Sequence, residues 1–314
     1  MLGETEMLAD QIAYVALASN DPDATCTVIE KHFGLPRAEF ASPQGKVPVF
    51  ALGRSALAVF PLGHPMLEGE AKPGVHHIAL GVDSVETAAK RAAEAGVAAG
   101  MASSGLGGRK SVELDRASTV GVRTRLTERF GLGATSGNAI ERIDHLGVAS
   151  GDVFEDERVF AGKLGFAVES RQTDMEVSMA VESFTSDKYG VVYHNRAPQP
   201  VGGLRVTFIA VGDCELEFLA NFDPNQGAEV DHSRSGSTKQ DQGAITRFVQ
   251  SRGRGLHHVA LKARDINAAL SGMAAAGLPM IDTKGRPGSR RALIGFPHPK
   301  ATGGILMHLV QRDA

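Results

Sequence analysis

The stretch Gly253-Arg-Gly-Leu-His257-His258-Val-Ala-Leu261 is followed by the segment 265–277, Asp-Ile-Asn-Ala-Ala-Leu-Ser-Gly-Met-Ala-Ala-Ala-Gly, and then by the segment 296–310, Phe-Pro-His-Pro-Lys-Ala-Thr-Gly-Gly-Ile-Leu-Met-His-Leu-Val. The apolar runs predict strands, and the small and apolar residues at helical spacing before a glycine predict a helix. His258 and His308 both fall in otherwise apolar strands. A lone strand histidine is more often a hydrogen-bonded core residue than a ligand. Two histidines in one unit favour a site if the fold brings them together.

This pattern occurs four times in the chain. The segment Gly74-Val-His76-His77-Ile-Ala-Leu80 resembles residues 255–261, and each is followed by an alanine-rich helical segment that ends in Ala-Gly. The segments 12–19 and 143–150 resemble each other in the same way. Units of strand, helix and strands therefore begin near residues 11, 75, 143 and 256. Such mixed units predict an α+β fold.

The four units divide into two similar halves. The glycine-rich seam 131–138 predicts a linker, with one domain over residues 1–132 and another over 140–314. The third unit is the longest, because residues 171–212 add strand-like segments and 221–243 form a polar loop. That loop is interpreted either as a lid or as a simple insertion.

Composition limits the function classes. A chain of 314 residues can bury two cores, and a net charge of −3 favours neither nucleic acid nor an anionic membrane as partner. Tryptophan is absent, which argues against an aromatic platform for stacking bases. We expect neither a membrane span nor a signal peptide, because the sequence shows no run of eighteen apolar residues and no basic segment followed by an apolar one. We expect a cytoplasmic protein with free thiols at Cys26 and Cys214. The expected partner is a small-molecule substrate, and a homodimer is left open.

Aligning the repeats predicts a metal site in the second half. His145 and His258 lie on the first strands of units three and four, and Glu217 and His308 lie on the last strands. Period-two alternation places Glu215 and Glu217 on one face. Imidazole nitrogens and a carboxylate oxygen suit one divalent transition metal ion such as Zn, Ni, Co or Fe(II).

The first half provides an internal comparison. Its equivalent positions carry Tyr14, Ala58, His77 and Arg125, which are not a metal ligand set. His77 is therefore expected to be structural. We expect the domain 1–132 to be a degenerate pair of modules without metal, which serves as a scaffold or as a wall of the substrate cavity.

At this point the chain is identified as a member of the vicinal oxygen chelate superfamily, which includes glyoxalase, bleomycin resistance proteins and dioxygenases. The resemblance covers about residues 10–130 and 140–312. It implies four βαβββ modules paired into two domains, each with a cupped sheet. The second half resembles methylmalonyl-CoA epimerase most, through Ile143-Asp-His145, Glu215-Leu-Glu217, residues 255–260 and His298-Pro-Lys-Ala-Thr-Gly-Gly.

The chain departs from that epimerase family at two positions. The family has a carboxylate, thought to be both ligand and base, where this chain has His308. Its second base falls near residues 205–207, Arg-Val-Thr, which include no carboxylate. Because epimerisation at an α-carbon needs two proton acceptors, the family's own reaction is in doubt here.

Three functions from different classes follow. The leading one is a metal-dependent lyase or isomerase of glyoxalase or epimerase type, acting on a small organic acid or acyl thioester through a metal-stabilised enolate or oxyanion. The alternative is a non-heme Fe(II) dioxygenase of the extradiol or 4-hydroxyphenylpyruvate dioxygenase type, with a ligand set drawn from His145, His258 and Glu217. The third is a binding protein that sequesters its ligand, like the resistance proteins of the superfamily.

Other side chains are candidates for catalysis or substrate binding. His194 and Tyr193 are candidate catalytic groups, with an exposed loop as the alternative. Arg286, Arg291 and Lys300, together with Arg290, surround two turns and are suited to hold a carboxylate or phosphate. A solvated basic face is the alternative for this group.

Overall fold

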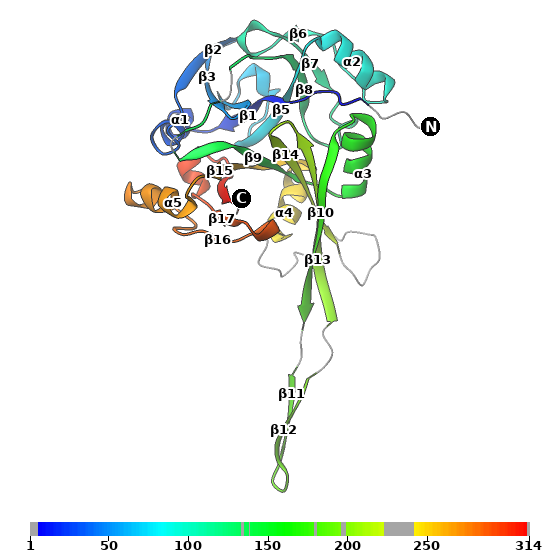
Figure 1. Ribbon diagram of the computed structural model, residues 1–314, viewed down its shortest axis with the longest axis vertical. Coiled ribbons are helices and arrows are strands. Elements are labelled where there is room, and N and C mark those ends of the chain that lie inside the picture. The colour runs from blue at the N-terminus through cyan, green and yellow to red at the C-terminus, as the bar shows by residue number, and fades with distance from the viewer. Residues whose placement is uncertain are drawn as a thin grey trace.

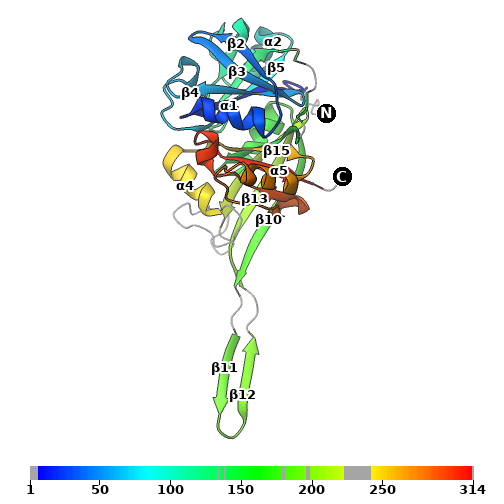
Figure 2. The same cartoon turned by 90° about the vertical axis from the view of Figure 1, so that its left-hand side faces the viewer.

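The computed structural model describes residues 6–132, 135–137, 139–178, 181–195, 199–222 and 242–312. Two eight-stranded sheets are stacked in one body, and a two-stranded hairpin projects from it (Figures 1 and 2). The elements of the first half are β1 (Ile12–Ser19), α1 (Pro22–Lys31), β2 (Arg37–Ser42), β3 (Gly45–Leu52), β4 (Ser55–Pro61), η1 (Pro65–Leu67), β5 (Gly74–Val82), α2 (Val85–Glu94), β6 (Ser103–Ser104), η2 (Leu106–Gly108), β7 (Lys110–Leu114) and β8 (Thr124–Glu128).

The second half repeats the order and adds to it. Its elements are β9 (Ile140–Ala149), α3 (Val153–Glu157), η3 (Arg158–Lys163), β10 (Ala167–Ser178), β11 (Val181–Ser186), β12 (Gly190–Asn195), β13 (Gln199–Val211), β14 (Cys214–Phe222), α4 (Gln242–Arg252), β15 (Gly255–Ala263), α5 (Ile266–Ala275), β16 (Arg286–Pro287), η4 (Ser289–Arg291), β17 (Leu293–Gly295), η5 (Pro299–Thr302) and β18 (Met307–Gln311).

The two sheets have the same topology. Their strand orders are β2-β3-β4-β1-β5-β8-β7-β6 and β10-β13-β14-β9-β15-β18-β17-β16, so each strand of one sheet has a counterpart in the other. Each half thus consists of two βαβββ modules joined side by side through β1 and β5 or through β9 and β15. The structure confirms the α+β fold with two cupped sheets. We propose that these sheets form the two domains 1–132 and 140–314.

Helix limits follow the capping residues that the sequence provides. The side chain of Asp21 accepts a hydrogen bond from the backbone of Ala24 at the start of α1, and Asp265 does the same for Ala268 at α5. After α5 the chain turns at Gly277 with φ +80°, a conformation that favours glycine. The predicted helix over 265–277 is therefore confirmed.

The two halves share one apolar core. A single cluster of buried side chains contains residues of both sheets, such as Leu17 in β1 and Leu146 in β9. Cys26 in α1 and Cys214 in β14 belong to this core and are free thiols, as expected. The backbones also approach closely, since a Cβ atom at Gly212 would lie 2.7 Å from the carbonyl oxygen of Asp10. The halves are held as one packed body.

The third unit differs most from its counterparts. Strands β10 and β13 are long, and the hairpin of β11 and β12 extends beyond their ends in Figure 1. Helix α4 has no equivalent in the first half, and the sequence patterns did not predict it. Most of the polar loop 221–243 lies outside the described residues, which leaves its role as an expectation.

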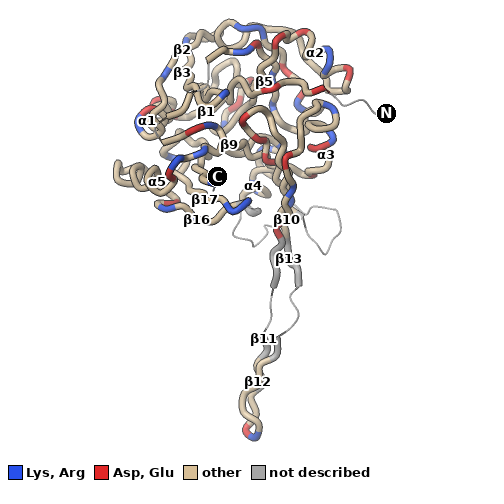
Figure 3. The backbone as a smooth tube through the Cα atoms, viewed as in Figure 1, with Lys and Arg blue, Asp and Glu red and all other residues tan. Residues whose placement is uncertain are grey.

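Charge and hydropathy agree with the composition. Basic and acidic residues are interspersed along the backbone of both halves in Figure 3. Among the described residues, no helix combines the length and the apolar character that a membrane crossing requires.

Candidate metal centre

Three histidines meet on the concave side of the second sheet. His145 comes from β9, His258 from β15 and His308 from β18, which are consecutive strands of the sheet. One ring nitrogen of each lies within 4.8 Å of the others, and all three residues are at most 5% exposed. The structure therefore brings together the three histidines that the repeat alignment selected.

Glu217 completes the group from the neighbouring strand β14. Its Oε2 atom is 3.3 Å from Nε2 of His145 and 3.5 Å from Nε2 of His258. Ligand atoms at about 2.0–2.1 Å from one ion are separated by about 2.8–3.0 Å at right angles in octahedral geometry and by about 3.3–3.4 Å in tetrahedral geometry. Burial acts to raise the pKa of Glu217, but its neighbours His145, His258 and Arg290 lower it overall. The group is thus held as a carboxylate.

The histidine nitrogens have the character of open ligand positions. Among the described residues, Nε2 of His258 and Nδ1 of His308 are buried without a hydrogen-bond partner. Burial, followed by the nearby rings of His258 and His145, lowers the pKa of His308 well below its usual value. A neutral buried imidazole with an unused lone pair fits a divalent metal ion.

Gly147 makes room for the ring of His258. A Cβ atom at Gly147 would overlap the His258 imidazole, whose strand β15 pairs with β9 at this point. Ala16 occupies the same position in the first half, where it pairs with His77. The absence of a side chain at residue 147 is therefore a local requirement of the histidine cluster.

We predict that Gly147→Ala displaces the His258 ring and destabilises the protein by about 1–3 kcal/mol, as for overpacking of a filled core. Urea unfolding and the imidazole NMR signals would measure both effects. Gly272→Ala in α5 is the matched control, because nothing lies within 4 Å of a Cβ atom there. If the two variants unfold alike, the proposed steric role of Gly147 is wrong.

A bulge in β9 turns Asp144 toward its neighbour. The pairing of β9 with β15 skips Asp144, between His145 opposite Ala260 and Ile143 opposite Leu261. Oδ2 of Asp144 accepts a hydrogen bond from Nδ1 of His145 at 2.9 Å. This fixes the ring so that its Nε2 lone pair faces the cluster, an arrangement common around metal-binding histidines.

Two arginines hold Asp144 as an anion. Arg142 and Arg312 lie 3.1 Å and 2.6 Å from its carboxylate oxygens. Burial alone would raise the pKa of Asp144, but the hydrogen bond from His145 and these charges lower it to about 2. The carboxylate is buried with three partners and does not need a proton.

A second bulge, in β15, brings His257 beside His258. Their Nδ1 atoms are 3.0 Å apart, and the His257 ring packs edge-on against Phe248 of α4 at 5.0 Å. Burial lowers the pKa of His257 to about 3. A neutral His257 can accept a hydrogen bond from the Nδ1–H group of His258. The lone pair of His258 is then on Nε2, the atom that faces Glu217.

The cluster lines a cavity with mostly apolar walls. Phe208 of β13 and Phe296, directly after β17, line this cavity, and Arg312 adds a positive charge. Arg290 lies 3.5 Å above the Phe208 ring and forms ion pairs with Glu215 and Glu169. The lining is typical of a small-molecule site with a few polar groups.

The other sequence candidates are distributed unevenly. Arg286 stacks over Phe296 at 5.2 Å, and the Phe296 ring lies 4.7 Å from the His308 ring, so one side chain links Arg286 to the cluster. Arg291 and Lys300 are exposed. Tyr193 and the backbone of His194 belong to the hairpin β11–β12, which projects away from the cluster (Figure 1). Tyr193 is 71% exposed. The roles assigned to these residues stay predictions. Arg291, Lys300 and Tyr193 do not join the histidines, and the side chain of His194 lies outside what the structure describes.

Three residues of the centre were missed by sequence analysis. Asp144 precedes a selected ligand, and Ala13 takes its place in the first half, so the difference between repeats was a usable signal. His257 belongs to a His-His pair that both halves share. Arg312 follows the last strand and has no comparable signal.

The cup of the first half is filled differently. Ala58 pairs with Ala16 as Glu217 pairs with Gly147, and Arg125 pairs with Ala79 as His308 pairs with Ala260. These registers agree with the repeat alignment. By the same registers, Tyr14 holds the position in the first sheet that His145 holds in the second, and His77 holds the position of His258.

Apolar side chains and the ion pairs of Arg125 with Glu68 and Glu113 occupy that first cup. Tyr14, Phe60, Met66 and Phe130 belong to a buried cluster there. The concave face that holds the histidines in the second half is thus closed by packing in the first.

Comparisons with known proteins agree with this architecture. Two family models match the chain, at residues 144–296 and 11–119, and both are described as the Glyoxalase/Bleomycin resistance protein/Dioxygenase superfamily. The mitochondrial methylmalonyl-CoA epimerase of Mus musculus is 26% identical over 130 residues, which are 41% of this chain. The match spans 64% of that relative, less than two thirds of its length.

Solved structures with similar folds include enzymes from bacteria. A mutant of 4-hydroxymandelate synthase from Streptomyces coelicolor is 15% identical, covers 98% of this chain and 93% of its own, and has a TM-score of 0.63. Methylmalonyl-CoA epimerase from Mycobacterium tuberculosis is 20% identical, covers 58% of this chain and 95% of its own, and has a TM-score of 0.39. Since both family models carry one description and together span most of both halves, the chain belongs to the Glyoxalase/Bleomycin resistance protein/Dioxygenase superfamily.

Proposed function

We propose that the protein is a metal-dependent enzyme that holds a small organic acid or acyl thioester through two neighbouring oxygens and catalyses a lyase or isomerase reaction. The supporting observation is the buried group of His145, His258, His308 and Glu217 at the base of a cavity. A divalent ion held by this group would act as a Lewis acid toward a carbonyl or enolate oxygen.

Charge and cavity lining favour an anionic substrate with an apolar part. Three neutral imidazoles and one carboxylate leave a divalent ion with a net charge of about +1, which attracts an anion. Arg312 lines the same cavity. Phe208, Phe296 and the aliphatic side chains around them would exclude water from the rest of the substrate.

A second candidate, an Fe(II) dioxygenase, is favoured by the architecture. The full two-half arrangement is shared with the 4-hydroxymandelate synthase structure, which is a likeness of fold. The ligand count favours the first candidate. Dioxygenases with two histidines and one carboxylate leave three positions of an octahedral ion open, whereas four protein ligands leave two. Two positions suit a substrate that chelates through two oxygens.

Oxygen consumption separates the two candidates. The protein would be reconstituted anaerobically with Zn, Ni, Co or Fe(II) and assayed against 2-hydroxy acids, 2-oxo acids and acyl thioesters with and without oxygen. We expect turnover without oxygen. Turnover that requires stoichiometric oxygen with Fe(II) would support the dioxygenase instead, and ligand binding without turnover under all conditions would support a sequestering protein.

We predict negligible epimerisation of methylmalonyl-CoA by the natural protein. Proton exchange at an α-carbon needs two acceptors, and Glu217 is the one carboxylate among the described residues that line the cavity. His308 replaces the carboxylate that the epimerase family has at that position. Deuterium exchange at the α-carbon is the measurement, and rapid exchange would show that the bases were misassigned.

A further inference from the structure

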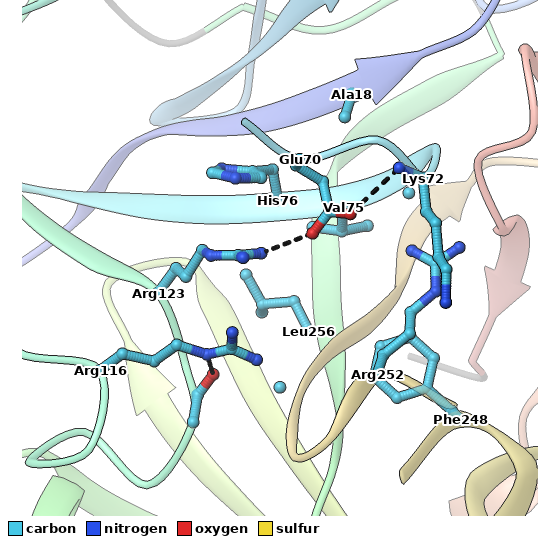
Figure 4. Close-up of a pocket in the computed structure, with 13 residues that line it drawn as sticks. Ala18, Glu70, Lys72, Val75, His76, Arg116, Arg123, Phe248, Arg252 and Leu256 are labelled. Carbon is cyan, nitrogen blue, oxygen red and sulfur yellow. Dashed lines mark hydrogen bonds and ion pairs between the residues drawn. The ribbon is translucent and has the colours of Figure 1, made fainter. Parts of the chain in front are cut away.

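A second cavity lies where the two halves meet. Figure 4 shows its lining residues, which come from β5 and the loops around it in the first half and from α4 and β15 in the second. It shares no lining residue with the cavity that contains the histidine cluster. Four of its lining side chains are basic, Lys72, Arg116, Arg123 and Arg252, and one is acidic, Glu70.

The single carboxylate does not balance these cations. Glu70 accepts a hydrogen bond from Arg123 at 3.1 Å and another from the backbone nitrogen of Lys72 at 3.0 Å. Arg116 donates to the carbonyl oxygens of Gly121 and Arg254, at 3.0 Å and 3.1 Å, which orients its guanidinium without neutralising it. The cavity wall thus carries an excess of fixed positive charge.

Arg252 is the cation of this cavity with the fewest polar contacts. Its guanidinium stacks on Phe248 at 5.6 Å, whereas Lys72, Arg116 and Arg123 each donate a hydrogen bond to an oxygen. Burial lowers the pKa of Arg252, and the charge of Arg123 acts in the same direction against that of Glu70. The five donor groups of this side chain are free to bind an anion.

His76 adds a buried donor to the same wall. The residue is 3% exposed, and its Nε2 atom has no hydrogen-bond partner among the described residues. Its Nδ1 atom lies 2.7 Å from Nδ1 of His77, whose Nε2 lies 3.2 Å from the hydroxyl of Tyr14. Burial raises the pKa of Tyr14 to about 12, so the hydroxyl keeps its proton and can donate it to His77.

The proton arrangement follows from that donation. If Tyr14 donates to Nε2 of His77, then Nδ1 of His77 carries a proton and donates to Nδ1 of His76. His76 then carries its own proton on Nε2. Burial and Arg123 lower the pKa of His76 to about 4, so the ring is neutral and carries one N–H group that has no partner among the described residues.

We propose that this cavity binds a phosphoryl group, held by Arg252, Arg123 and Arg116 with the N–H of His76. A multiply charged oxyanion matches the charge excess, and planar guanidinium groups match phosphate geometry. The source is either free phosphate or the phosphate end of a larger ligand. The inference goes beyond the proposed reaction and does not depend on it.

Calorimetric titration of the whole protein with inorganic phosphate tests the proposal. We expect one saturable site per chain. Arg252→Gln should weaken phosphate binding by at least about tenfold, because a hydrogen bond to a charged group is lost. Arg252→Lys keeps the charge and should restore part of the affinity. Arg264→Gln, which removes an exposed arginine paired with Glu141, is the matched control and should bind like the natural protein.

Two further binding measurements show where the phosphate binds and which molecule supplies it. Binding that persists in His258→Ala does not come from the histidine centre. Competition between coenzyme A and phosphate would show that the site holds the end of a larger ligand, whereas phosphate binding without such competition would indicate a free anion. The proposal is overturned if no saturable phosphate binding occurs below about 10 mM, or if Arg252→Gln leaves the affinity unchanged.

Discussion

Replacing His258 by alanine is expected to abolish stoichiometric metal binding. The imidazole is 4% exposed, and its Nε2 atom faces Glu217 at 3.5 Å. If a zinc site stabilised by about 10–16 kcal/mol divides that energy among four ligands, each contributes about 2.5–4 kcal/mol, or roughly a hundredfold to a thousandfold in affinity. Elemental analysis after gel filtration, followed by titration against a competing chelator, measures the loss.

His77→Ala is the matched control for this variant. His77 has the same position in the first sheet and is fully buried, but Tyr14 and Arg125 surround it in place of ligands. We expect His77→Ala to lower the unfolding temperature and to keep the metal. Equal metal content in His258→Ala and the natural protein would remove His258 from the ligand set.

Replacing Asp144 by alanine is expected to damage both stability and the metal centre. The side chain is 1% exposed, and its loss leaves Arg312, Arg142 and Nδ1 of His145 without their shared acceptor. Removing one partner of a buried ion pair costs about 3–5 kcal/mol. Loss of a carboxylate that orients a metal-binding histidine weakens metal affinity by about 10–100-fold.

Urea unfolding and chelator competition measure the two effects separately. Glu141→Gln, on the same strand, is the control, because Glu141 is partly exposed and pairs with Lys262 and Arg264 at the surface. Its change in unfolding free energy should stay below about 1 kcal/mol. An Asp144→Ala protein with unchanged stability and metal affinity would contradict the role assigned to the bulge in β9.

The architecture could be predicted because it is repeated in the sequence. The matching segments 12–19 and 143–150, and 74–80 and 255–261, set the same strand registers in both halves. The repeat alignment therefore selects His145, Glu217, His258 and His308 by position alone. Comparing them with Tyr14, Ala58 and Arg125 distinguished the two cups.

The surroundings of the cluster could not be predicted from alternation. Strict alternation sends Asp144 and His145, or His257 and His258, to opposite faces of a strand. A β-bulge at each pair breaks this alternation. The composition of a strand does not show which residue the strand pairing will leave out. Helix α4, which supplies Phe248 and Arg252, follows a polar segment that gave no helical pattern.

The basic turn shows a similar limit. Arg290 and Arg291 both have positive φ, at 52° and 59°, in the short turn η4. That irregular backbone sends Arg290 inward to Glu215 and leaves Arg291 exposed. Sequence alone treated these neighbours as equivalent, because the direction of each side chain depends on dihedral angles that spacing does not reveal.

The central claim is that one divalent ion binds to His145, Glu217, His258 and His308. Anomalous diffraction from crystals of the metal-loaded protein, recorded at the absorption edge of the ion, tests this claim most directly. We predict one peak per chain, within about 2.0–2.3 Å of the four ligand atoms. A stoichiometric ion bound elsewhere, or no peak at the cluster after loading with Zn, Ni, Co and Fe(II) in turn, would contradict it.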